Sequence, residues 1–240
     1  MTIKEKMNSI NRTARFAGFL YLIMIPLGLF GIMWVSSLIV PGDAAITANN
    51  IMASESLFRL SIMSALILQT GHILLVLVLY KLLKAVNKNH ALLMVIFMLV
   101  AVPIAMLNEL NRLAVLLLLS GADYLTVFTA DQLQALVPLF LGLHEHGINI
   151  AGIFWGLWLF PMGYLVFKSG YIPRILGVLL IIAGFGYLLD FFTFFLLPNF
   201  YATINQITQF TGWGELLLPL WLLIKGVNVE QWEKRALESA

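Results

Sequence analysis

Long apolar runs separated by short polar breaks dominate the hydropathy pattern of this 240-residue chain. Each run is close to or longer than the roughly 20 residues that an α-helix needs to cross the hydrocarbon core of a bilayer. Because a helix pairs its backbone groups internally, as the bilayer interior requires, the pattern predicts an all-α, polytopic membrane protein. The six predicted transmembrane helices cover residues 16–40, 57–80, 91–119, 133–167, 174–197 and 207–225.

Composition supports this class, since 61% of the residues are hydrophobic and only 11% are charged. Arranged as three in-out-in hairpins, the six helices place twelve of the fourteen Lys and Arg residues on one side, with Arg59 and Arg112 as the exceptions. The positive-inside rule then predicts that both termini are cytoplasmic. We therefore expect a cytoplasmic N-terminal segment (1–15), a six-helix transmembrane domain (16–225) and a cytoplasmic tail (226–240), in the cytoplasmic (inner) membrane of a bacterium.

Several polar and ionisable residues lie inside the apolar runs. A charged side chain at membrane depth costs several kcal/mol unless it is paired or hydrated, so each such residue is a candidate for function. We take these residues as candidates for lining a cavity or binding a ligand: His72, Glu109, Arg112, Glu145, His146, Asn149, Asp190 and Glu215.

Helical geometry predicts which face of the fourth span points inward. At about 100° per residue, the glycines share one stripe with two of the candidates, and His146 lies at its edge. Small residues favour close helix packing in membranes, so this stripe is expected to face the bundle interior. His144 points nearly the opposite way and is not expected to share the site. The stripe consists of Gly142, Glu145, Asn149, Gly152, Gly156 and Gly163.

Depth along the helices predicts a polar, net-acidic cavity that opens outward. At 1.5 Å per residue, His72 and Glu215 lie near the membrane midplane, whereas Glu109, Glu145 and Asp190 lie toward the outer side. The carboxylates outnumber the nearby cations, so protons or a bound cation must balance them. Such a site is typical of a protein that binds or transports a cation, a proton-coupled solute or a small amphiphile. Alternatively, the crevice is only hydrated, and Glu109 and Arg112 neutralise each other as a structural pair.

Two other functions remain open from the residues alone. The first is a metal-dependent intramembrane hydrolase, in which His146, Glu145, His72 and Asp190 are the candidate ligands of a divalent metal. No H-E-x-x-H pattern supports it, and the absence of cysteine excludes thiolate ligands. The second is an accessory or scaffold subunit of a membrane complex. Lipid is the expected partner in every case, the net charge of +2 gives no indication of nucleic-acid binding, and the oligomeric state is left open.

Short motifs along most of the chain carry a family resemblance. They include Arg15-Phe-Ala-Gly18, Gly152-Ile-Phe-Trp-Gly156, Pro161-Met-Gly163, Ser169-Gly170 with Pro173-Arg174, Gly186-Tyr187, and Glu215 ahead of Trp221 and Lys225-Gly226. In these motifs the chain resembles the bacterial membrane family catalogued as domain of unknown function 4386. The resemblance implies a compact membrane protein of six or seven helices, and it assigns no catalytic residues.

Overall fold

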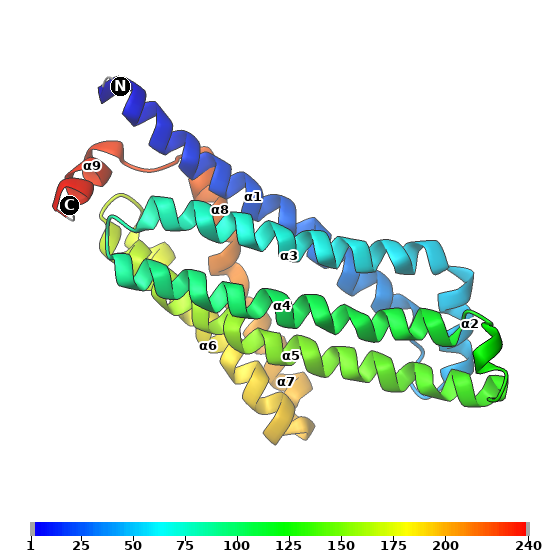
Figure 1. Ribbon diagram of the computed structural model, residues 1–240. Helices are drawn as coiled ribbons and strands as arrows, with labels where there is room; N and C mark the ends of the chain where they lie inside the picture. Colours follow the sequence, from blue (N-terminus) through cyan, green and yellow to red (C-terminus); the bar gives the residue numbers. More distant parts are fainter. Residues whose placement is uncertain (1–2, 239–240) are drawn as a thin grey trace. The chain divides into compact units, whose positions relative to one another are not determined.

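The computed structural model describes residues 3–238, with side chains from Ser9 onward, and this part of the chain is helical without strands (Figure 1). Six stretches are long and apolar enough to cross a membrane, which confirms the predicted all-α class and the six spans. The elements are α1 (Ile3–Leu38), α2 (Ala44–Ala53), α3 (Glu55–Leu83), α4 (Lys88–Leu118), η1 (Asp123–Leu125), α5 (Ala130–Ser169), α6 (Arg174–Leu196), α7 (Pro198–Thr208), η2 (Gln209–Gly212), α8 (Trp213–Ile224) and α9 (Val229–Glu238).

The sixth predicted span is interrupted. The apolar stretch Pro198–Ile224 consists of α7, the short 3₁₀ segment η2, and α8. Within the segment, the Thr211 hydroxyl donates to the Thr208 carbonyl at 2.6 Å, so a side chain satisfies a backbone acceptor at the interruption. A stretch of 3₁₀ geometry inside a longer helix is a common mark of a hinge or of a functional site.

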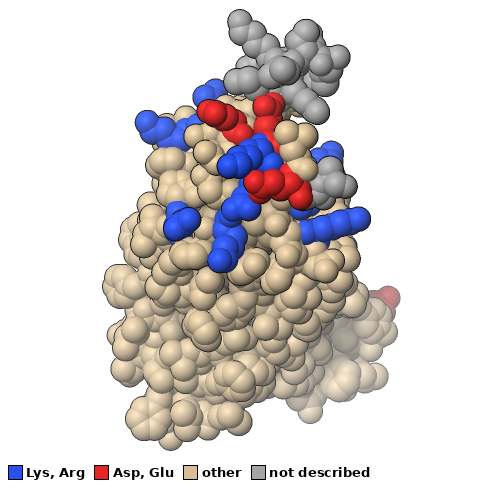
Figure 2. Space-filling model, turned by 90° about the vertical axis from the view of Figure 1, so that its left-hand side faces the viewer, with Lys and Arg blue, Asp and Glu red and all other residues tan. Residues whose placement is uncertain are grey.

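The described chain divides into two compact units. Unit 1 contains residues 1–23, 71–102 and 149–240, and unit 2 contains residues 24–70 and 103–148. Twelve of the fourteen Lys and Arg residues belong to unit 1, and Arg59 and Arg112 belong to unit 2. On the face drawn in Figure 2, basic side chains gather toward one end beside several acidic ones, and the rest of that face is almost uncharged. Charge is therefore segregated along the chain as a positive-inside protein requires.

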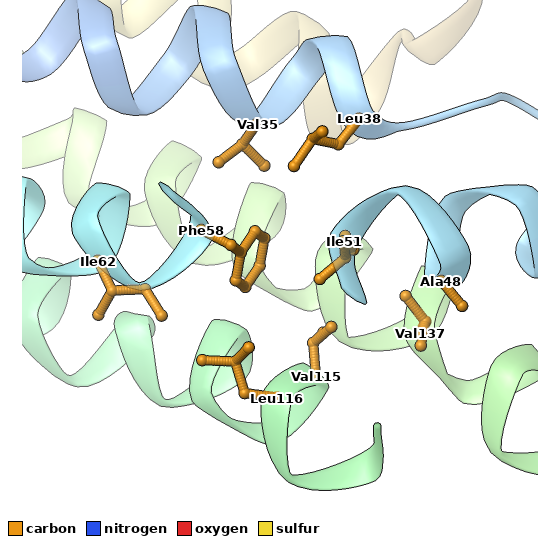
Figure 3. Packing of buried hydrophobic residues seen from close by; sticks show 9 residues of the cluster. All are labelled: Val35, Leu38, Ala48, Ile51, Phe58, Ile62, Val115, Leu116 and Val137. Atoms are coloured by element: carbon orange, nitrogen blue, oxygen red, sulfur yellow. The ribbon is translucent and has the colours of Figure 1, made fainter. Parts of the chain in front are cut away.

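A hydrophobic cluster holds unit 2 together. Phe58 of α3 is fully buried and lies between side chains of α1 and α4 (Figure 3). The Ser64 hydroxyl adds a polar link by donating to the Leu27 carbonyl of α1 at 2.7 Å. The nine buried members of the cluster are Val35, Leu38, Ala48, Ile51, Phe58, Ile62, Val115, Leu116 and Val137.

Glycines bring α5 and α6 into backbone contact in unit 1. A Cβ atom built on Gly163 would lie 2.7 Å from the Gly177 carbonyl oxygen, and one built on Gly177 would lie 2.5 Å from the Gly163 carbonyl oxygen. Two turns earlier on α5 and two turns later on α6, a Cβ on Gly156 would lie 3.1 Å from the Gly184 carbonyl oxygen. Without a hydrophobic driving force in lipid, such close approach is a main source of helix–helix attraction.

The C-terminal segment ties the ends of several unit 1 helices together. The Tyr171 hydroxyl and the Trp232 Nε1 both donate to the Leu82 carbonyl of α3, at 2.8 and 2.9 Å. Gly226, with a φ of 70°, turns the chain so that the Val227 amide reaches the Asn11 side chain at 3.0 Å. Burial raises the pKa of the Tyr171 phenol, and the nearby Arg235 acts in the opposite direction.

Candidate functional site

The carboxylate of Glu215 lies in a polar cluster within unit 1. Glu215 stands in the first turn of α8, directly after the 3₁₀ segment. The Tyr21 hydroxyl of α1 donates to its Oε2 at 2.8 Å, and the Tyr187 hydroxyl of α6 is a second hydrogen-bond partner. No basic side chain in residues 9–238 forms an ion pair with Glu215. The carboxylate is therefore held by neutral donors from two other helices.

Packing fixes the two tyrosines in this position. Tyr21 is 6% exposed and its ring is 6.1 Å from the ring of the buried Trp158. Tyr187 fits against α5 because residue 156 is a glycine, whose added Cβ would lie 2.9 Å from the Tyr187 Cβ. Both hydroxyl groups thus have little freedom to leave the Glu215 carboxylate.

Asp190 of α6 belongs to a separate pair. The Thr208 hydroxyl, at the end of α7, donates to Asp190 Oδ1 at 2.6 Å. Residue 186 is a glycine, and a Cβ built there would collide with the Thr211 side chain of the 3₁₀ segment. Helix α6 thereby approaches the interruption closely. Asp190 contacts the end of α7, before the interruption, and Glu215 belongs to α8, after it.

A second, fully buried cluster lies in unit 2, between α4 and α5. Glu109 Oε1 is 3.0 Å from His144 Nε2, and Glu109 Oε2 is 3.5 Å from Arg112 Nη1. The three residues are 3–7% exposed. Glu109 therefore connects a cation and an imidazole in a water-poor place, where such interactions are strong.

The backbones of α4 and α5 meet beside this cluster. The buried Asn108 donates from Nδ2 to the His144 carbonyl at 2.8 Å, and the Asn111 amide donates to Asn108 Oδ1 at 2.9 Å. Residue 147 is a glycine because any Cβ there would overlap the Asn108 side chain. The contact fixes the rotation of α5 and turns His144 toward Glu109.

The predicted inward face of the fourth span was therefore wrong in its unit 2 half. His144 is buried against Glu109, whereas Glu145 and His146 are exposed. The glycine stripe does describe the half of α5 that packs on α6, but the preceding half packs on α4 through the face that contains Gly147. A 40-residue helix with different neighbours along its length has no single inward face.

The other predicted residues are distributed over both units. His72 and Asn149 are partly buried in unit 1. The candidate metal ligands His146, Glu145, His72 and Asp190 form no ligand set, since no group of three or more His, Asp or Glu within the described chain could hold a metal ion. Among the candidates, Glu109 and Arg112 form an ion pair.

A small cavity of about 190 Å³ lies in unit 2. The Glu55–Arg59 ion pair, 2.7 Å between Arg59 Nε and Glu55 Oε1, contributes to its lining, and more than half of each of these two side chains is exposed. The lining residues are Ile51, Met52, Glu55, Arg59, Leu116, Leu119 and Ser120. None of the predicted candidate residues is among them, so the cavity does not correspond to the expected acidic vestibule.

Sequence reasoning missed three residues of these clusters: Tyr21, Tyr187 and His144. Tyr187 lies three residues before Asp190 and so shares a helix face with it, which was the available signal. Tyr21 lies in the opening family motif, Arg15-Phe-Ala-Gly18-Phe-Leu-Tyr21, but that motif assigns no role, and a tyrosine in an apolar run is most simply a packing or interface residue. His144 was set aside by the assumption of a single helix face.

Comparison with known proteins places the chain in context. The family described as "Domain of unknown function (DUF4386)" matches residues 16–226. An uncharacterized protein of Archaeoglobus fulgidus is 39% identical over 84 residues, which covers 35% of this chain and 49% of that relative. The chain thus matches about half the length of this relative. No solved structure matches the chain.

Proposed function

Since the chain belongs to the DUF4386 family, for which the match assigns no activity, we propose a function from the geometry of the site: a multi-pass membrane protein that binds or transports a proton or a cation at Glu215, alone or with a solute. One observation carries this proposal. Glu215 is an acidic side chain within an apolar span, without an ion-pair partner among residues 9–238, and it follows directly after an interruption of that span. A carboxylate in such a place needs a proton or a cation to balance its charge.

The two tyrosines support exchange rather than permanent pairing. A hydroxyl group can donate to the charged carboxylate, and it can also remain in contact when the carboxyl is protonated, because it both donates and accepts. An arginine or lysine in the same place would instead form an ion pair with Glu215 and keep its carboxylate deprotonated. The set of Tyr21, Tyr187 and Glu215 can therefore exist in both states without repacking.

The interruption supports movement at the site. Discontinuous helices in transporters place ion and substrate sites at the interruption, where the backbone can change conformation. Here α7 and α8 both pack against α6. Asp190 contacts Thr208, before η2, and Glu215 lies on α8, after it. Rotation at Gln209–Gly212 would change the distance between these two carboxyl groups.

The remaining features of the proposal concern topology. Both termini are proposed to be cytoplasmic, with three hairpins between 16 and 225, short cytoplasmic ends at 1–15 and 226–240, and a location in a bacterial cytoplasmic membrane. The concentration of basic residues in unit 1 supports this orientation. An outward-opening acidic cavity at Glu215 and Asp190 of unit 1, reachable by a small cationic or amphiphilic ligand, belongs to the same proposal.

Transport can be tested in proteoliposomes that contain a pH indicator. A pH step or a sodium gradient across the membrane should produce proton movement that depends on the protein and is lost in Glu215→Gln. Asp131→Asn is the matched control, because Asp131 is an exposed acidic residue at the start of α5. Equal proton movement in wild type and Glu215→Gln would contradict the proposal.

A further inference from the structure

The cavity of unit 2 has an apolar floor and a charged mouth. Ile51 of α2 and Leu116 of α4 line it, and they are buried members of the cluster drawn in Figure 3. Glu55 and Arg59 of α3 and Ser120 also line it, and these three residues are exposed. A ligand in this cavity would therefore meet apolar side chains at its inner end and charged or polar groups at its outer end.

The Glu55–Arg59 ion pair leaves groups of both charges available at this mouth. Arg59 Nε donates to Glu55 Oε1 at 2.7 Å, and within the described chain neither the two Nη atoms nor Glu55 Oε2 has a hydrogen-bond partner. A guanidinium group is a planar fork of five donors, so its Nη edge can hold an oxyanion through two parallel hydrogen bonds. Glu55 Oε2 can accept from an ammonium group at the same time. The two positions are adjacent because the two side chains are in contact.

Charge balance at the mouth favours a ligand that carries both charges. Glu55 and Arg59 cancel each other, and the other residues that line the cavity are uncharged. An anion alone would bring its charge beside the Glu55 carboxylate, and a cation alone would bring its charge beside the Arg59 guanidinium. A zwitterion meets each group with the opposite charge, and the occupied site stays neutral.

The volume of the cavity limits the size of the ligand. The cavity measures about 190 Å³, which is below the range of roughly 300–1,000 Å³ that is typical of pockets for drug-sized molecules. At about 30 Å³ per water molecule in the liquid, it has room for roughly six waters. A short, branched aliphatic group therefore fits on the floor while a charged head lies at the mouth, and a long chain does not fit.

We propose that this cavity binds a small zwitterion, whose ammonium group contacts Glu55, whose oxyanion contacts Arg59, and whose apolar part reaches Ile51 and Leu116. The zwitterion comes either from an α-amino acid in solution or from the headgroup of a zwitterionic lipid. The cavity belongs to unit 2, whereas Glu215 belongs to unit 1. This proposal and the exchange of a proton or cation at Glu215 can therefore fail separately.

The test observes Arg59 directly in the full chain, in neutral maltoside micelles with ¹⁵N-labelled arginine. The chain has six arginines, and the Nε–Hε resonance of Arg59 is identified by its absence in Arg59→Gln. Titration with L-valine should shift this resonance to saturation. Isobutylamine is valine without its carboxylate, and isovalerate is valine without its ammonium group. Each should bind at least about tenfold more weakly than L-valine, because it loses one charge-assisted contact.

A second arm separates the two sources of the zwitterion. It compares the Arg59 resonance in nanodiscs of phosphatidylethanolamine, which has an ammonium group and a phosphate, with nanodiscs of phosphatidylglycerol, which has only the phosphate. A saturable shift with L-valine identifies a soluble zwitterion. A difference between the two lipids without a response to L-valine identifies a lipid headgroup.

Variants assign the two charged contacts. Glu55→Gln removes the partner of the ammonium group, so it should weaken L-valine binding at least about tenfold and abolish the preference for L-valine over isovalerate. Arg235→Gln is the matched control, because it removes the arginine of another exposed ion pair, with Glu238 in unit 1, and should leave the affinity unchanged. Exposed ion pairs contribute little to stability, so both variants should fold.

The unmodified protein decides the matter even if a variant fails to fold. The proposal would be overturned if Arg59 showed neither a saturable response to L-valine nor a difference between the two lipids. Equal affinities for L-valine and isovalerate, or for L-valine and isobutylamine, would also overturn it, because the second charge would then contribute nothing.

Discussion

Gly163 and Gly152 of α5 offer the sharpest test of how the helices pack. The two positions lie on nearly the same face of one helix, eleven residues apart, and both are buried. A Cβ on Gly163 would lie 2.7 Å from both the Gly177 carbonyl oxygen and the Ile181 Cγ1, whereas a Cβ on Gly152 would meet nothing within 4 Å. Alanine at these two positions should therefore have opposite effects on stability.

The magnitude follows from the separation that the new methyl group needs. An ordinary contact requires about 3.4 Å, so α5 and α6 must move apart by about 0.7 Å at Gly163, and the obstacle is partly backbone. Overpacking of this kind costs about 1–3 kcal/mol. At Gly152 the substitution only removes the conformational freedom of glycine, which stabilises a helix by up to about 1 kcal/mol. The two free energies of unfolding should thus differ by about 1–4 kcal/mol.

The assay is reversible unfolding in mixed maltoside and dodecyl sulfate micelles, followed by circular dichroism. Gly177→Ala should resemble Gly163→Ala, since its Cβ would lie 2.5 Å from the Gly163 carbonyl oxygen. The double variant should lose less than the sum of the two, because one separation of the helices relieves both contacts. If Gly163→Ala is no less stable than Gly152→Ala, the proposed α5–α6 contact is wrong.

Three further predictions concern other parts of the chain. Removing either Glu109 or Arg112 should cost about 3–5 kcal/mol of unfolding free energy, and the double variant Glu109→Gln/Arg112→Gln should recover much of the loss in a double-mutant cycle; additive losses would refute the pairing. Tyr171→Phe should cost about 0.5–1.5 kcal/mol at neutral pH. Because burial raises the Tyr171 pKa, this contribution is complete below the ordinary phenol pKa of about 10 and is lost as pH rises above it, so a wild-type alkaline melting profile identical to that of the variant would contradict the assignment. In spheroplasts, a membrane-impermeant thiol reagent should label Tyr124→Cys but not Asn89→Cys, and the reverse pattern would invert the proposed topology.

Hydropathy predicted the spans because the ability of a helix to cross a bilayer depends mainly on its length and composition. The interruption at Gln209–Gly212 was not predictable in this way, since it depends on local hydrogen bonds such as that from Thr211 to Thr208. The short helix α2 was also missed, although Asp43, whose side chain accepts from the Ile46 amide at 2.8 Å, is a typical N-cap. Local signals of this kind are easily overlooked inside polar breaks between apolar runs.

The candidate site was predictable by residue type but not by partner. Glu109, Arg112 and Glu215 are polar residues in apolar spans, which single-residue reasoning detects. Their partners His144 and Tyr21 come from other helices, so their identity depends on the rotation and depth of each helix. In the case of His144, that rotation is set by the contact between Gly147 on the same helix and Asn108 on the facing helix α4, which no periodicity within α5 reveals.

The central claim, that Glu215 exchanges a proton or cation, is tested most directly by infrared difference spectroscopy of the full chain in lipid between about pH 5 and about pH 9. The account predicts a carboxyl C=O band that titrates in this window or on addition of sodium, disappears in Glu215→Gln and changes frequency in Tyr21→Phe, because the Tyr21 hydroxyl contacts that carboxylate. Glu230→Gln, a change at an exposed residue of α9, should leave the band unaltered. A spectrum with no titrating carboxyl band, or with a band that persists in Glu215→Gln, would contradict the account.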